Sequence, residues 1–197
     1  MRVKLFTHTD LDGIGCAVLA YLAFGKENVD VEYCNYDDID NKVEVFMEDC
    51  DLYRSYDKIF ITDISVSDSV ANMIDILDRV DRRVQLFDHH GTALFLNKYD
   101  WCMINEYIYL ANIIKTCGTE LFCVYALWPE YLNICTPYAR TKILNFVTVV
   151  RNYDTWCWKE LGNIGLTSKQ MNDLFHIYGR EKFIDWAMKR IQHQDEW

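Results

Sequence analysis

The fold is decided by the stretch Val3–Gly13, which reads VKLFTHTDLDG. Its first residues, up to Thr7, are mostly apolar or β-branched and predict a short buried strand. Polar residues follow, and a helical pattern then runs from Gly13 to Phe24 and ends at Gly25. A strand that passes through a polar turn into a helix is the first half of a βαβ unit, from which parallel sheets are built.

The same alternation of strand and helix continues through the first hundred residues. Helical spacing of apolar residues recurs from Ile39 to Cys50 and from Val66 to Val80. Further strands are expected at Val29–Cys34, Lys58–Thr62, Arg83–Phe87 and Trp101–Ile104. We therefore predict an α/β fold: a parallel sheet of about five strands with helices on both faces.

From Tyr107 onward the pattern is helical, and we expect a helical C-terminal segment. The expected helices cover 107–127, 137–152, 166–179 and 181–192. We interpret residues 1–197 as a single domain, with a sheet core over 1–105 and a mainly helical part over 106–197.

Composition restricts the class of protein. Half of the residues are apolar, and no apolar run reaches the length of a membrane span or resembles a secretory signal, so we expect a cytoplasmic protein without membrane contact. Eight cysteines without a Cys-x-x-Cys pair indicate free, mostly buried thiols. The net charge of −10 disfavours binding to long DNA but allows a small nucleotide substrate.

Acidic and histidine residues gather where strands are expected to end, which is where α/β folds place their active sites. The turn His8-Thr9-Asp10-Leu11-Asp12-Gly13 follows the first strand, Asp63 follows the third, and Asp88-His89-His90 follows the fourth. Asp154 ends a long apolar helix. Each motif alone is weak, because a strand-end aspartate is more often a cap or loop residue, but the four together indicate one site.

A metal centre is the chemistry that this set favours. Several carboxylates in one crevice would raise one another's pKa unless cations compensate their charge. Imidazole and carboxylate donors without thiolate suit Mn²⁺, with Mg²⁺, Co²⁺, Fe²⁺ or Zn²⁺ as alternatives.

The order of these motifs resembles that of the DHH phosphoesterase superfamily, and the sequences of the motifs are most similar to those of its NrnB-type nanoRNases. The resemblance implies two divalent cations and a two-metal hydrolysis. It implies that His8, Asp10 and Asp63 hold one cation, and that Asp12, Asp63, His89 and Asp154 hold the other. His90 would face the substrate phosphate, and Asp88 would support the histidine pair, so that His90, Asp63 and Asp88 are the expected catalytic residues.

The residues on either side of Asp154 in the sequence admit more than one interpretation. Arg151 is a candidate phosphate contact beside His90, although an arginine at such a position is more often solvated or salt-bridged. Trp156 and Trp158 flank Asp154, and we expect them to pack and position its loop, with base stacking as the alternative.

One departure from the family bears on the substrate. Family phosphodiesterases usually carry a second, DHHA1 domain with a glycine- and histidine-rich loop, and no Gly-Gly-Gly-His string occurs here. We expect the DHH domain without DHHA1, acting on short oligoribonucleotides or on linear or cyclic dinucleotides. A pyrophosphatase or nucleotide phosphatase, or a non-hydrolytic nucleotide-binding or regulatory protein, is the alternative. A homo-oligomer whose neighbouring subunit closes each cleft is a further hypothesis.

Overall fold

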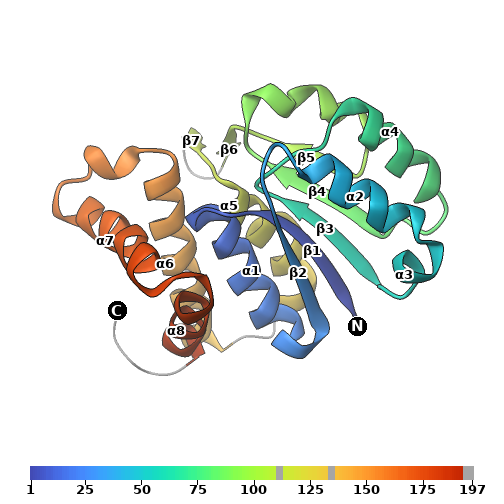
Figure 1. The fold of residues 1–197 in the computed structure, drawn as a ribbon. Helices are drawn as coiled ribbons and strands as arrows, with labels where there is room; N and C mark the ends of the chain where they lie inside the picture. The colour runs from blue at the N-terminus through green and yellow to red at the C-terminus, as the bar shows by residue number, and fades with distance from the viewer. Residues whose placement is uncertain (110–112, 133–135, 193–197) are drawn as a thin grey trace.

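A computed structural model of the chain describes residues 1–109, 113–132 and 136–192. Five parallel strands form one sheet in the order β2-β1-β3-β4-β5 (Figure 1). The strands are β1 (Val3–His8), β2 (Val29–Cys34), β3 (Lys58–Thr62), β4 (Val84–Asp88) and β5 (Cys102–Ile104). The prediction of a parallel sheet of about five strands is confirmed.

Helices cover both faces of the sheet, as predicted. Alternate strand residues point to opposite sides, and the apolar residues on each side are buried beneath helices. In β1, Leu5 joins a buried cluster on one face of the sheet, whereas its neighbour Phe6 joins a second cluster on the other face. The helices of the first hundred residues are α1 (Leu11–Phe24), η1 (Lys26–Asn28), α2 (Ile39–Glu48), α3 (Cys50–Arg54), α4 (Asp68–Leu77) and η2 (Gly91–Lys98).

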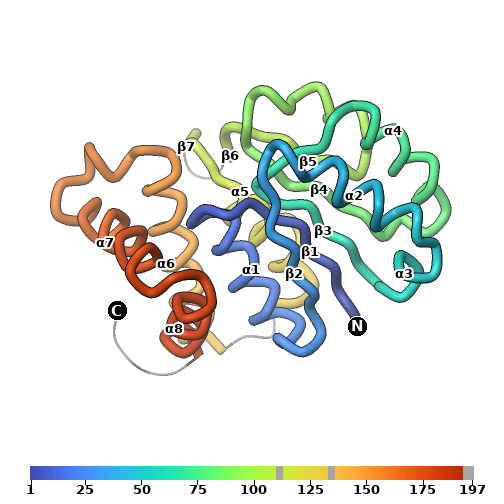
Figure 2. Tube along the Cα trace, in the orientation of Figure 1, coloured from blue at the N-terminus to red at the C-terminus, as the bar shows by residue number. Residues whose placement is uncertain are grey.

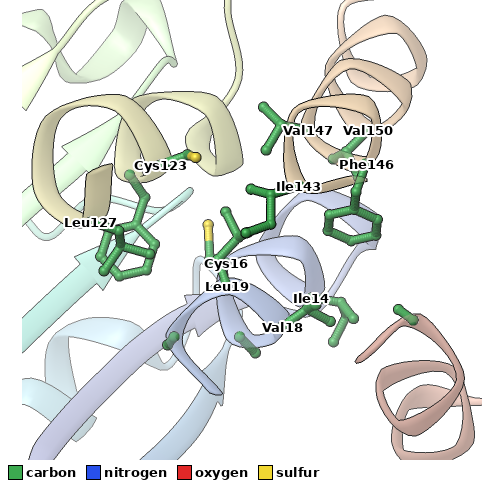
Figure 3. Packing of buried hydrophobic residues seen from close by; sticks show 14 of the residues in the cluster. Ile14, Cys16, Val18, Leu19, Cys123, Leu127, Ile143, Phe146, Val147 and Val150 are labelled. Carbon is green, nitrogen blue, oxygen red and sulfur yellow. The ribbon is translucent and has the colours of Figure 1, made fainter. Parts of the chain in front are cut away.

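The later part of the chain is helical, as predicted, after a short hairpin. Its helices are α5 (Gly118–Leu121), the π-helical η3 (Phe122–Leu132), α6 (Pro137–Asp154), η4 (Cys157–Lys159), α7 (Asn163–Tyr178) and α8 (Arg180–Gln192). Figure 3 shows how this part joins the sheet: Cys16 and Leu19 of α1 lie between Leu127 of η3 and Ile143 of α6. Burial of these apolar side chains fixes the helical part against the sheet.

The prediction of one helix over 107–127 is wrong at its start. Tyr107–Tyr109 (β6) pairs antiparallel with Ile113–Lys115 (β7), and residues 110–112 lie outside the described part. In β6 the central Ile108 is buried while both flanking tyrosines are exposed. This alternation of period two is that of a strand, whereas a helix places residues three or four apart on its buried face.

The cysteines agree with the expectation of free thiols. The seven cysteines in the described ranges are free thiols, and four of them are buried. No helix within those ranges combines the length and the apolarity required to cross a bilayer.

Candidate metal centre

The strand order changes direction between β1 and β3, and the predicted site lies at the carboxyl ends of these strands. From β1 the chain goes outward to β2 and then returns to β3 on the other side of β1. Thr62 Oγ1 donates to Thr7 Oγ1 at 2.9 Å, and Thr7 Oγ1 donates to the Gly13 carbonyl at 3.0 Å. These bonds tie both strand ends to the start of α1. Ligands of doubly wound folds bind in the crevice beyond such a switch point.

The turn between β1 and α1 holds His8 and Asp10 together. Asp10 caps α1: its Oδ1 accepts hydrogen bonds from the backbone N–H groups of Asp12 and Gly13, both at 3.1 Å. Its Oδ2 is left over and lies 3.0 Å from His8 Nδ1. A Cβ at Gly13 would lie 2.2 Å from the His8 carbonyl oxygen, so only glycine allows the helix to begin this close to the strand.

Asp12 is buried and is held by a distant segment of the chain. Its two carboxylate oxygens accept from the backbone N–H groups of Gly118 at 2.6 Å and Thr119 at 2.9 Å, in the first turn of α5. Thr119 Oγ1 also donates to the Asp12 carbonyl at 2.6 Å. Figure 2 shows α5 beside the start of α1, where these bonds form. The sequence reasoning missed this support; the small pair Gly118-Thr119 before an apolar run is its only signal.

Asp63 lies at the centre of the cluster in an unusual backbone conformation. It is 1% exposed and has a φ of 57°, in the left-handed region that aspartate tolerates better than most residues. Its Oδ1 lies 3.3 Å from His89 Nε2 and its Oδ2 lies 3.8 Å from His8 Nδ1. Gly118 packs against it, because a Cβ there would lie 2.6 Å from the Asp63 Cβ. Asp63 thus faces both histidines at once.

Asp88 orders the histidine pair. Its Oδ1 accepts from the backbone N–H of His89 at 2.7 Å and lies 2.7 Å from His90 Nδ1, while its Oδ2 accepts from Ser65 Oγ at 2.6 Å. The Asp88 hydrogen bond raises the pKa of His90, against the opposing effect of burial. On its other side, His90 Nε2 lies 3.3 Å from the Tyr36 hydroxyl. Asp88 thus holds both histidines through hydrogen bonds.

Asp154 closes the site from the end of α6. Its Oδ2 lies 3.4 Å from His89 Nε2, which also lies 3.7 Å from Asp12 Oδ2. Burial and the neighbouring Asp12 raise the pKa of Asp154 to about 8. Burial and the charges of Asp12 and Asp10 likewise raise the pKa of Asp63 well above its usual range. The ionised forms of Asp63 and Asp154 are therefore unfavourable unless a positive charge joins them.

The donor atoms fit divalent metal ions. His8 Nδ1, Asp63 Oδ2 and His89 Nε2 are buried and, within the described residues, make no aligned hydrogen bond, although Asp10 Oδ2 lies 3.0 Å from His8 Nδ1 and Asp63 Oδ1 lies 3.3 Å from His89 Nε2. Such atoms are rare in folded proteins and indicate an ion as the missing partner. The potential ligand atoms fall into the groups His8/Asp10/Asp63, Asp12/His89/Asp154 and Asp63/Asp88/His89/His90, each within 4.8 Å. The structure thus brings all six predicted ligands together; their role as ligands stays a prediction.

Arg151 does not face this centre freely. Its guanidinium donates to Glu120 Oε1 at 2.7 Å, and Glu120 Oε2 accepts from Thr116 Oγ1 at 2.9 Å. Glu120 is buried, so the arginine serves to neutralise it. The salt-bridged alternative describes Arg151 in this structure, and a phosphate contact would require this ion pair to open.

Concave surfaces flank the site on two sides. One cleft is lined by Tyr36, Ser65, His90 and Phe95, and the other by His89, Lys115, Asp154 and Trp156. Tyr36 and Ser65 were not among the predicted site residues, because a tyrosine and a serine in loops after strands carry no motif of their own. Their position beside His90 and Asp88 becomes visible only with the fold.

Comparison of the sequence with known proteins finds one curated relative. No protein-family profile matches the chain. The chain is 31% identical over 193 residues to oligoribonuclease NrnB of Bacillus subtilis (strain 168), and the match covers 98% of this chain and 46% of that protein. The chain therefore spans just under half the length of this relative.

Two solved structures share the fold. The crystal structure of an uncharacterized protein from Helicobacter pylori G27 has a TM-score of 0.73 at 17% identity, covering 98% of this chain and 56% of that one. RecJ in complex with Mn²⁺ from Thermus thermophilus has a TM-score of 0.54 at 12% identity, covering 98% of this chain and 32% of that one. At these identities the likeness is one of fold.

The doubly wound sheet, with the turn from His8 to Gly13, Asp63 and Asp88-His89-His90 at its switch point, defines a class. The sequence similarity of this chain to the Bacillus oligoribonuclease, together with the shared fold, supports a protein of the DHH family. Within that family it is an NrnB-like protein, by its similarity to the Bacillus oligoribonuclease. The predicted absence of a DHHA1 domain stays a prediction, because the match covers only part of that relative.

Proposed function

We propose that the chain is a divalent-metal-dependent phosphodiesterase that hydrolyses short oligoribonucleotides, or linear or cyclic dinucleotides. The observation that carries the proposal is the set of three buried potential ligand atoms on His8, Asp63 and His89, which make no aligned hydrogen bond among the described residues and have further carboxylates close by. The relative is named an oligoribonuclease, and the net charge of −10 favours a short substrate over long nucleic acid.

In this proposal, two cations occupy the cluster. His8, Asp10 and Asp63 hold one, while Asp12, Asp63, His89 and Asp154 hold the other, with Mn²⁺ preferred over Mg²⁺, Co²⁺ or Fe²⁺. The RecJ crystal structure is of a complex with Mn²⁺, and the imidazole and carboxylate donors of the present chain suit that ion. When bound, such ions supply Lewis-acid activation of water and neutralise charge on the phosphate.

His90 is the proposed substrate contact among the histidines. Asp88 fixes its Nδ1, so its Nε2 is the nitrogen that remains for a ligand, beside the Tyr36 hydroxyl. The hydrogen bond with Asp88 raises the pKa of His90, against the opposing effect of burial, and so stabilises the protonated form of the ring. A protonated His90 can bind a phosphoryl oxygen and can deliver a proton to the leaving oxygen.

The test is hydrolysis of a labelled RNA dinucleotide by protein first stripped of metal, with and without Mn²⁺. We expect mononucleotide release that depends on Mn²⁺ and is lost in Asp63→Asn. Asparagine is the chosen replacement because it tolerates the left-handed backbone at this position and removes only the charge. Asp173→Asn, on the surface of α7, is the matched control and should leave the rate unchanged.

Other outcomes separate the alternatives. Release of inorganic phosphate from pyrophosphate or a mononucleotide, without dinucleotide cleavage, would replace the proposal with a phosphatase. Tight nucleotide binding without any turnover at saturating Mn²⁺ would indicate a binding or regulatory protein.

A further inference from the structure

A cleft with an aromatic wall extends from one side of the metal centre. His89 and Asp154 lie at the site, and Lys115 of β7 and Trp156 line the same cleft. Trp156 follows Asp154 by two residues, so the end of α6 places a carboxylate and an indole next to each other.

Trp156 does not pack as expected from the sequence. Its side chain is 64% exposed, whereas the nearby Trp158 stacks on Tyr153 with ring centroids 6.2 Å apart. Packing in the core therefore does not explain why a tryptophan occupies position 156. The expectation that both tryptophans pack to position the loop holds for Trp158 alone.

The backbone of Trp156 makes this exposure more notable. Its φ of 64° lies in the left-handed region, just after the end of α6, where helices usually carry glycine. A bulky side chain is strained in this conformation, and such strain tends to be retained at sites of function. The structure thus holds a large exposed ring at a backbone position that favours glycine.

Cations accompany the ring although the chain is acidic. Lys159 Nζ lies 3.9 Å from the centroid of the indole, over one of its faces. Lys115 is exposed in the cleft, and no ion pair or hydrogen bond of its side chain occurs in the described parts of the chain. An aromatic platform with lysines beside it is the arrangement that binds single-stranded nucleotides.

We propose that the indole of Trp156 is the platform on which one nucleobase of the substrate stacks, with the Lys115 ammonium binding an anionic oxygen of the same nucleotide. The stacked base is that of a nucleotide joined by the phosphodiester that is cleaved. This assignment therefore rests on the proposed function. The cleft on the other side of the site is a weaker candidate. There the Tyr36 hydroxyl contacts His90, and no lysine or arginine of the described residues lines the wall.

Three variants test the platform. Trp156→Gly removes the ring and suits the left-handed backbone, Trp156→Phe keeps an aromatic ring, and Trp158→Phe is the matched control. We expect Trp156→Gly to raise KM for an RNA dinucleotide about 5- to 150-fold at unchanged kcat, the range of one base–aromatic stack. A dinucleotide analogue that lacks the base on the stacked side should show no change, and Trp156→Phe should keep most of the affinity.

Thermal stability distinguishes a platform from a structural residue. Because glycine relieves the strain, the melting temperature of Trp156→Gly should stay within about 2 °C of the parent. A large loss of stability, or an unchanged KM for the dinucleotide, would overturn the proposal.

A binding measurement keeps this result separate from the proposed function. Adenosine monophosphate should quench the tryptophan fluorescence of the parent protein and of Trp158→Phe, but not that of Trp156→Gly, and ribose 5-phosphate should quench none of them. If this pattern holds while no diester is hydrolysed, the base subsite stands and the diesterase assignment fails. If diesters are cleaved and the quenching does not depend on Trp156, the diesterase stands and the subsite fails.

Discussion

Asp88 shows how one buried carboxylate can order two neighbouring residues of the site. Its carboxylate is buried and accepts from both the histidine pair and Ser65. A buried carboxylate that accepts several hydrogen bonds keeps its charge, and its pKa is lowered by His90 despite burial. The orientation of His90 and its raised pKa therefore depend on one side chain.

We expect Asp88→Asn to lower the pKa of His90 and to reduce activity about 10- to 100-fold, the usual cost of losing a partner behind a metal site. The pKa falls because the neutral amide no longer stabilises the protonated ring. An NMR titration of His90 and a pH–rate profile measure the two effects. Ser65→Ala removes only one hydrogen bond to Asp88 and should have a smaller effect. An unchanged His90 titration in Asp88→Asn would contradict this account.

At the scale of elements, the site depends on the first turn of α5 meeting the turn before α1. Gly118 donates to Asp12 and leaves no room for a Cβ beside Asp63. One glycine thus supports two carboxylates that come from different strand ends.

We expect Gly118→Ala to impair metal binding and hydrolysis by about tenfold or more, because the added methyl group would displace Asp63 by a distance that catalytic sites do not tolerate. Isothermal titration with Mn²⁺ and the dinucleotide assay measure the loss. Gly91→Ala is the control: its Cβ would meet only the Glu106 side chain, which can move away. Equal metal affinity of both variants would show that Gly118 does not position Asp63.

The elements could be predicted where apolar periodicity is unambiguous. Val29–Cys34 and Lys58–Thr62 have the predicted bounds: the first alternates apolar and charged residues from Val29 to Glu32, and the second has a continuous apolar run from Ile59 to Ile61. The hairpin of β6 and β7 was mistaken for a helix because its strands have three residues each, too few to separate a period of 2 from 3.6.

For the whole molecule, the sheet order explains why motif reasoning was effective. Residues that follow parallel strands converge at one edge of the sheet, so His8, Asp63 and Asp88 could be grouped from sequence alone. The backbone groups that hold Asp12 and the ion pair of Arg151 could not, because these contacts join segments separated by 106 and 31 residues without any periodic signal.

The stability of the whole chain should report on the charge of its site. Asp63 and Asp154 have raised pKa values in the folded protein, about 8 for Asp154, against an ordinary value of about 4 in the unfolded chain. Between these values the metal-free folded state binds protons that the unfolded state does not. The contribution of these protonated carboxyls to the free energy of unfolding is therefore fully present at low pH and is lost as pH rises from about 4 to about 8. His90, whose pKa is also raised, acts in the same direction.

We expect the melting temperature of the metal-free protein to fall between about pH 5.5 and about pH 8.5. Mn²⁺ should restore it by an amount that grows with pH, because cations replace the bound protons. At about 100 times the dissociation constant, the ion contributes about 2.7 kcal/mol, or about 5–11 °C for a chain of this size. Without metal, Asp63→Asn should be more stable than the parent at the higher pH and should gain little from Mn²⁺. A metal-induced shift of the melting temperature that is equal at both pH values, or equal in Asp63→Asn and the parent, would mean that the ion binds elsewhere. Binding at this cluster must depend on pH, because the ion replaces the protons on Asp63 and Asp154.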